Sequence, residues 1–107
     1  LKTQTINEIY KYKKGDCDAL SSLLASNFIS VGITSRLVLV RSKKPEKGSE
    51  DYAHVVVFFE NGLVDENSQP CGNIVDPSYF KEKNFVENII FSANYLNAEN
   101  FNINFLN

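Results

Sequence analysis

The most strongly helical part of the chain is Cys17-Asp18-Ala19-Leu20-Ser21-Ser22-Leu23-Leu24-Ala25-Ser26-Asn27-Phe28-Ile29-Ser30-Val31. Its apolar side chains recur at steps of three and four residues, which predicts an α-helix with one buried stripe. These apolar residues are Ala19, Leu20, Leu23, Leu24, Phe28 and Val31. Gly32 follows at the position where glycine commonly ends a helix, so we expect the helix to cover about residues 17–31.

Outward from this helix, two β-rich stretches predict neighbouring strands, over residues 33–41 and 52–60. The polar residues 42–51 between them contain Pro and Gly and indicate an exposed loop. The run 55–59 is apolar on both faces, which is typical of a strand covered on both sides. Asn61-Gly62 predicts a hairpin turn, with a partner strand beginning at residue 63.

The rest of the chain predicts shorter elements. We expect a turn over residues 65–73, a short strand over 73–76 that Pro77 ends, a helix around 85–90 and a strand over 100–105. A further short helix is expected over 3–13. The prediction is one α+β domain, residues 1–107, with a mostly antiparallel sheet. The chain begins without Met, which allows it to be an excerpt of a longer protein.

The composition narrows the classes of function. With 43% hydrophobic and 22% charged residues, the chain resembles an ordinary globular protein. A net charge of −2 argues against a nucleic-acid partner, which requires a basic surface. No apolar run approaches the roughly 18 residues of a membrane span, and no signal peptide is visible. We therefore expect no membrane partner, while compartment and oligomeric state stay open.

Cys17 is the first candidate for chemistry because it opens the predicted helix. Backbone N–H groups at a helix start favour a thiolate and can donate to an oxyanion. The alternative is a small buried core residue, as many cysteines are. Cys71 lies in a predicted turn without a base nearby, and we interpret it as structural. One His and two Cys give no metal-ligand spacing, so no metal or cofactor is expected.

His54 and Asp76 are the other two candidates. His54 is the only histidine and lies on a predicted strand, whose pleat fixes its direction. Asp76 ends a short strand, where a carboxylate can orient an imidazole and stabilise its protonated form. Taken singly, each has an ordinary explanation: a half-exposed strand histidine, and an Asp-Pro turn.

Taken together, four separated pieces of the chain, within about residues 14–80, resemble the transglutaminase-like superfamily. The pieces are Gly15-Asp16-Cys17-Asp18-Ala19-Leu20-Ser21-Ser22-Leu23-Leu24, Val31-Gly32-Ile33-Thr34-Ser35-Arg36-Leu37-Val38, His54-Val55-Val56-Val57 and Ile74-Val75-Asp76-Pro77-Ser78-Tyr79. In that family a cysteine opens the core helix, and a strand histidine and a Val-Asp-Pro aspartate complete a catalytic triad.

The resemblance implies a papain-like core in which Cys17, His54 and Asp76 act as a triad on a peptide or isopeptide amide of a peptide or protein substrate, as in small bacterial and phage members. Hydrolysis by a cysteine peptidase or amidase is favoured over cross-linking by a transglutaminase, because a small open site admits water. A catalytically inactive binding or structural module of the same fold is the other alternative. The second oxyanion donor is unassigned, with Gln4, Tyr10 and Tyr12 as candidates.

Overall fold

The computed structural model describes residues 17–43, 53–96 and 99–106, and within them the chain forms an α+β fold. The elements are α2 (Cys17–Ser30), β1 (Ser35–Ser42), β2 (Ala53–Val64), β3 (Pro70–Val75), the 3-10 helix η1 (Pro77–Tyr79), α3 (Phe85–Tyr95) and β4 (Phe101–Phe105). The strands form one antiparallel sheet in the order β3-β2-β1-β4. The expected α+β class is therefore confirmed, whereas the expected helix over 3–13 lies outside the described residues.

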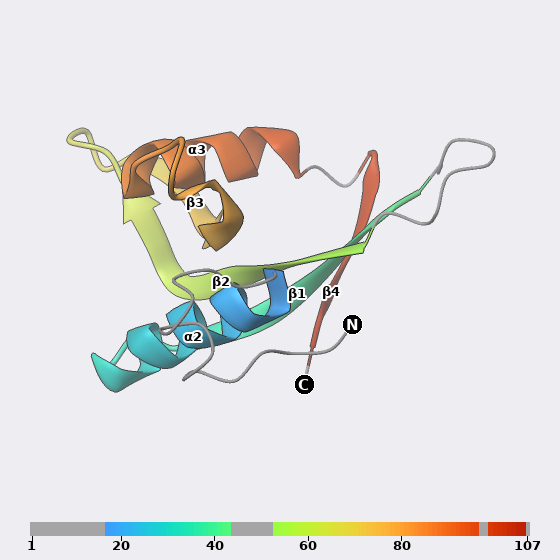
Figure 1. Ribbon diagram of the computed structural model, residues 1–107. Coiled ribbons are helices and arrows are strands. Elements are labelled where there is room, and N and C mark those ends of the chain that lie inside the picture. The colour runs from blue at the N-terminus through green and yellow to red at the C-terminus, as the bar shows by residue number, and fades with distance from the viewer. Residues whose placement is uncertain (1–16, 44–52, 97–98, 107) are drawn as a thin grey trace.

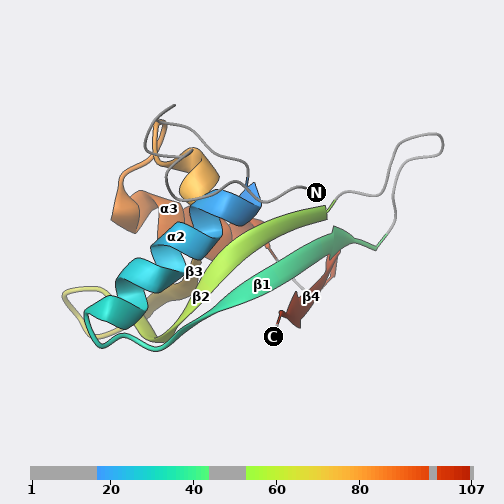
Figure 2. The same cartoon turned by 60° about the horizontal axis from the view of Figure 1, so that its bottom comes forward.

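The helix α2 ends as its sequence predicts. Gly32 has a φ of +87°, a left-handed conformation that glycine adopts without steric cost. The N–H of Ile33 donates to Phe28 O at 2.9 Å, and the N–H of Gly32 donates to Ile29 O at 3.0 Å. This pair of hydrogen bonds is a Schellman motif, which turns the chain from the end of α2 into β1 (Figure 2).

The predicted hairpin turn at Asn61-Gly62 is wrong. Both residues have positive φ, 66° and 59°, but they lie inside β2, where the pairing with β3 is irregular. The chain reverses between Asp65 and Gln69 instead, because Asp65 Oδ1 accepts the N–H groups of Asn67 and Gln69 at 2.8 and 2.9 Å. The strand β3 consequently begins at Pro70, where the sequence predicted a turn.

Both faces of β2 are buried, as its apolar run predicts. Val55, Val56 and Val57 are 5%, 0% and 0% exposed. Val57 belongs to a cluster with Ala25 of α2, while Val56 packs in a second cluster that includes Leu96, directly after α3. The helix α2 lies across β1 and β2, and α3 packs on β3 (Figure 1).

Candidate active site

His54 and Asp76 form a hydrogen-bonded pair at one end of the sheet. His54 is the second residue of β2, and Asp76 directly follows β3. His54 Nε2 lies 2.6 Å from Asp76 Oδ2, and the two side chains are 14% and 6% exposed. Because a carboxylate only accepts, the proton between the two atoms lies on Nε2, and in the neutral form of the imidazole Nδ1 is then the unprotonated nitrogen. An imidazole in this tautomer can act as a general base through Nδ1.

The carboxylate of Asp76 is held in place from several directions. Asp76 Oδ1 accepts the N–H of Ser78 at 3.0 Å, so both carboxylate oxygens are used. The main chain of Asp76 is clamped by Asn88 of α3, whose Oδ1 accepts the Asp76 N–H at 2.8 Å. Asn88 Nδ2 also donates to Asp76 O at 2.6 Å, and Asn88 is fully buried. The helix α3 thus fixes the residue that orients His54.

Cys17 is the first residue of α2 and is half-buried. Its thiol Sγ lies 3.7 Å from Asp18 Oδ1, in the geometry of a thiol donating to a carboxylate. Cys17 therefore has the helix-start position that its sequence context predicts, and this position puts backbone N–H groups of the first turn beside the thiol.

The amino-terminal half of α2 lies at an open edge of β2, next to His54. The carbonyl of Leu37 in β1 faces β4, because it accepts the N–H of Leu106. Peptide groups alternate in direction along antiparallel strands, so those of Val38 face its partner Val56 in β2. The carbonyl of Val55, next to Val56, therefore faces away from β1. Pairing with β3 ends at Val57, so no described strand receives this carbonyl. Ser21 Oγ of α2 donates to Val55 O at 2.9 Å instead.

The direction of α2 brings Cys17 toward the His54 end of β2. Further along the helix, Ser35 Oγ donates to Ala25 O, and Ser35 pairs with Phe59, five residues beyond His54 in β2. Cys17 precedes Ser21 by one helical turn, about 6 Å along the axis. The helix also contacts η1, which follows Asp76. The structure therefore joins His54 to Asp76 directly, and it places Cys17 at the start of a helix that contacts β2 and η1.

Cys71 has a different environment, because it lies in β3 and packs against the cluster around Val57. Its Sγ lies 4.0 Å from Gln69 O, at the limit for a sulfur hydrogen bond. Over residues 17–43, 53–96 and 99–106, no three His, Cys, Asp or Glu side chains are grouped as they would be around a metal ion.

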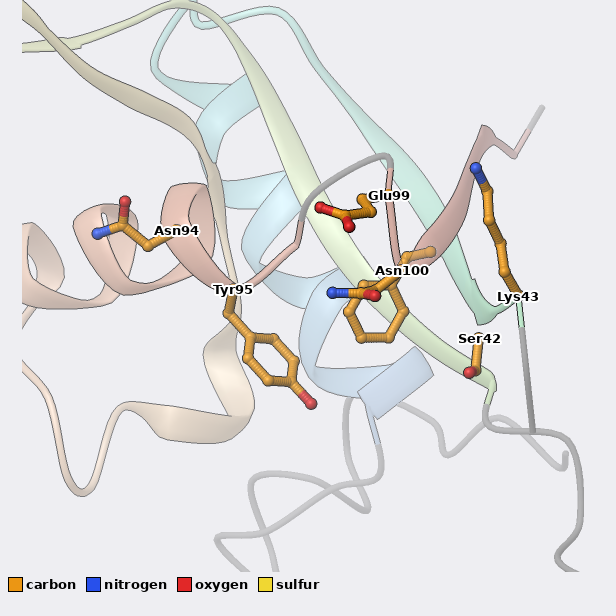
Figure 3. A pocket seen from close by; sticks show the side chains of 7 residues that line it. Ser42, Lys43, Asn94, Tyr95, Glu99 and Asn100 are labelled. Carbon is orange, nitrogen blue, oxygen red and sulfur yellow. The ribbon is translucent and has the colours of Figure 1, made fainter. Parts of the chain in front are cut away.

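A cavity of about 480 Å³ lies on the same face of the sheet as His54. Val40 of β1 pairs with His54, so their side chains lie on the same face of the sheet. Ser42 lies two residues further along β1, on that face, and lines the cavity together with its pairing partner Phe101 of β4. The rings of Tyr95 and Phe101 lie 5.4 Å apart between their centroids. The remaining lining residues are Lys43, Asn94, Glu99 and Asn100 (Figure 3). The cavity thus combines an aromatic wall with amide groups and one charge of each sign.

Two residues that support the site were not singled out by the sequence. Asn88 lies among Phe85, Ile89 and Ile90, and a polar residue within an apolar helical pattern is the signal that could have identified it. Ser21 lies one turn after Cys17 and is one of the three buried residues of α2, with Ala19 and Ala25, although it is outside the predicted apolar stripe.

No model of a protein family, no curated protein and no solved structure matches this chain. In the part of the chain that the structure describes, no helix has the length and apolarity that crossing a membrane requires. The resemblance to the transglutaminase-like superfamily therefore stays a prediction, supported by the residues themselves.

Proposed function

We propose that this protein is a cysteine-dependent acyl transferase of the papain-like, transglutaminase-like kind, which hydrolyses an amide of a peptide or protein. The observation that supports this most is the 2.6 Å hydrogen bond between His54 Nε2 and Asp76 Oδ2. A carboxylate at Nε2 fixes the ring and stabilises the imidazolium that forms when Nδ1 takes a proton. Cys17, at the start of α2, is the proposed nucleophile.

In the proposed reaction, His54 Nδ1 takes the proton of the Cys17 thiol as sulfur bonds to the amide carbonyl carbon. The tetrahedral oxyanion accepts hydrogen bonds from backbone N–H groups at the start of α2. The imidazolium then gives its proton to the leaving amine, the C–N bond breaks, and a thioester remains. Water attacks the thioester with His54 as base, which releases the acid and restores the thiol.

The cavity that contains Tyr95 and Phe101 is the proposed place for the part of the substrate next to the scissile amide. It lies on the His54 face of the sheet, about 7 Å along β1 from Val40, the pairing partner of His54. Aromatic rings and amide groups together suit an uncharged peptide segment, because they offer both apolar contact and hydrogen bonds.

A non-catalytic binding module of the same fold is the second candidate. The contact between Cys17 Sγ and Asp18 Oδ1, at 3.7 Å, favours it, because a thiol that donates to a carboxylate is protonated in the resting protein. General-base catalysis by His54 is compatible with a resting thiol, so turnover decides between the two candidates.

The test uses the Cys71→Ser variant, incubated with a library of peptide amides and followed by mass spectrometry. We expect amine release together with an acyl adduct on Cys17, and we expect no adduct with Cys17→Ala. His54→Ala should lower turnover by about 10² to 10⁴-fold. Transfer to an added primary amine in preference to water would indicate cross-linking. Amine release that is unchanged in Cys17→Ala, or no release with any peptide, would contradict the proposed enzyme.

A further inference from the structure

The strand β4 forms the outer edge of the sheet, because the described strand order ends there. Two hydrogen bonds fix the direction of its peptide groups. Asn100 O accepts the N–H of Lys43, and the N–H of Leu106 donates to Leu37 O, both toward β1. Peptide groups alternate in direction along an antiparallel strand. Ile103 and Phe105 therefore direct their N–H and carbonyl groups away from β1.

The sequence of β4, Phe101-Asn102-Ile103-Asn104-Phe105, is the same in both directions. When two copies of such a strand pair antiparallel about Ile103, each side chain meets its own kind. Ile103 lies opposite Ile103 of the partner subunit, and Phe105 lies opposite Phe101 of the partner subunit. A two-fold axis through Ile103 generates this arrangement, as a symmetric dimer requires.

We propose that β4 is a self-association surface on which a second copy of this chain adds its own β4, extending the sheet across a two-fold axis at Ile103. The direction of the peptide groups agrees with this register, because Ile103 and its counterpart both present outward N–H and carbonyl groups. A register shifted by one residue would oppose peptide groups that already face β1.

The lack of charge in β4 and the exposure of its side chains favour a second copy of this chain as the partner that binds there. The five residues of β4 carry no charge, so two chains that each have a net charge of −2 can meet here without placing like charges side by side. Ile103 and Phe105 are 37% and 48% exposed. Within the strand there is also no proline or lysine, the residues that commonly protect an edge from pairing.

The size of the surface sets the expected affinity. One five-residue strand pair lies at the small end of specific interfaces, below about 1,200 Å². We therefore expect a reversible dimer that forms with rising concentration. Sedimentation equilibrium of the whole chain should show a mass that rises from 12.1 kDa toward twice that value.

The symmetry gives a sharp test, because residue 103 is the one position of β4 that meets itself. Ile103→Lys and Ile103→Glu should each weaken the dimer by about tenfold or more through like charges at the axis. An equimolar mixture of the two variants should restore association as a heterodimer. Asn104→Lys is the matched control: it faces Asn102 of the partner subunit, so its dimer constant should stay close to that of the unmodified chain.

A second measurement needs no variant. Amide hydrogen exchange in the unmodified chain should slow at Ile103 and Phe105 as protein concentration rises, and should stay constant at Asn104, whose peptide groups face β1. A mass of 12.1 kDa at every concentration would overturn the proposal. So would a dimer that both charged Ile103 variants leave intact, or a mixture that associates no better than either variant alone.

Discussion

Replacement of Asn88 by alanine tests how the site is held together. The variant loses two hydrogen bonds, from the Asp76 N–H to Asn88 Oδ1 at 2.8 Å and from Asn88 Nδ2 to Asp76 O at 2.6 Å. Asp76 is 4% exposed, so water does not readily replace the lost partners. Each buried group left unsatisfied costs about 1–3 kcal/mol, and we expect unfolding to become easier by about 2–4 kcal/mol in total.

Urea denaturation followed by circular dichroism measures this change. For a chain of this size, such a loss lowers the denaturation midpoint by about 2 M. Asn94→Ala is the matched control, because Asn94 lies exposed on the same helix, and its effect should stay within about 0.5 kcal/mol. A loss below about 1 kcal/mol for Asn88→Ala would show that Asn88 does not clamp Asp76.

The same assay checks two further predictions. Ser21→Ala leaves the buried Val55 carbonyl without the hydroxyl that donates to it, and should cost about 1–3 kcal/mol, whereas Ser26→Ala on the exposed side of α2 should cost little. Equal small effects would show that α2 does not cover the edge of β2 through this bond. Gly72→Ala should cost about 2–4 kcal/mol, because φ is +141° and a new Cβ would lie 3.1 Å from two α3 side-chain carbons. Gly32→Ala, with φ +87° and open space, should cost only about 1 kcal/mol; a larger loss there than at Gly72 would contradict the packing of α3 on β3.

The sequence predicts the elements well where one periodicity dominates. The stripe of α2, the two-faced run of β2 and the alternation of β4 all give the correct type of element. The predicted burial of the α2 stripe is wrong in part, because Val31 is 72% exposed and the buried residues of the helix are Ala19, Ser21 and Ala25. It fails at Asn61-Gly62, because a pair that favours a hairpin turn also fits an irregular stretch within a long strand. The true turn is made by the Asp65 carboxylate, whose two backbone bonds depend on the folded path of the chain.

For the candidate site, the sequence predicts that His54 and Asp76 are partners but does not predict the residues that support them. His54 and Asp76 were predicted as partners from their chemistry and order, and their 2.6 Å bond shows that the fold brings them together. Asn88 could not be assigned, because its two bonds join positions twelve residues apart through the packing of α3 on β3. Ser21 could not be assigned either, because its hydrogen bond to the Val55 carbonyl depends on β3 ending before it reaches Val55.

The most direct test of the proposed nucleophile is the rate at which iodoacetamide alkylates Cys17, compared with Cys71 in the same molecule. We predict that Cys17 reacts faster near neutral pH, because His54 assists removal of the thiol proton. In His54→Ala the rate at Cys17 should fall to that of an unactivated thiol, and in Asp76→Asn it should fall part of the way. Equal, slow labelling of both cysteines in the unmodified protein, or a rate at Cys17 that ignores the loss of His54, would contradict this prediction.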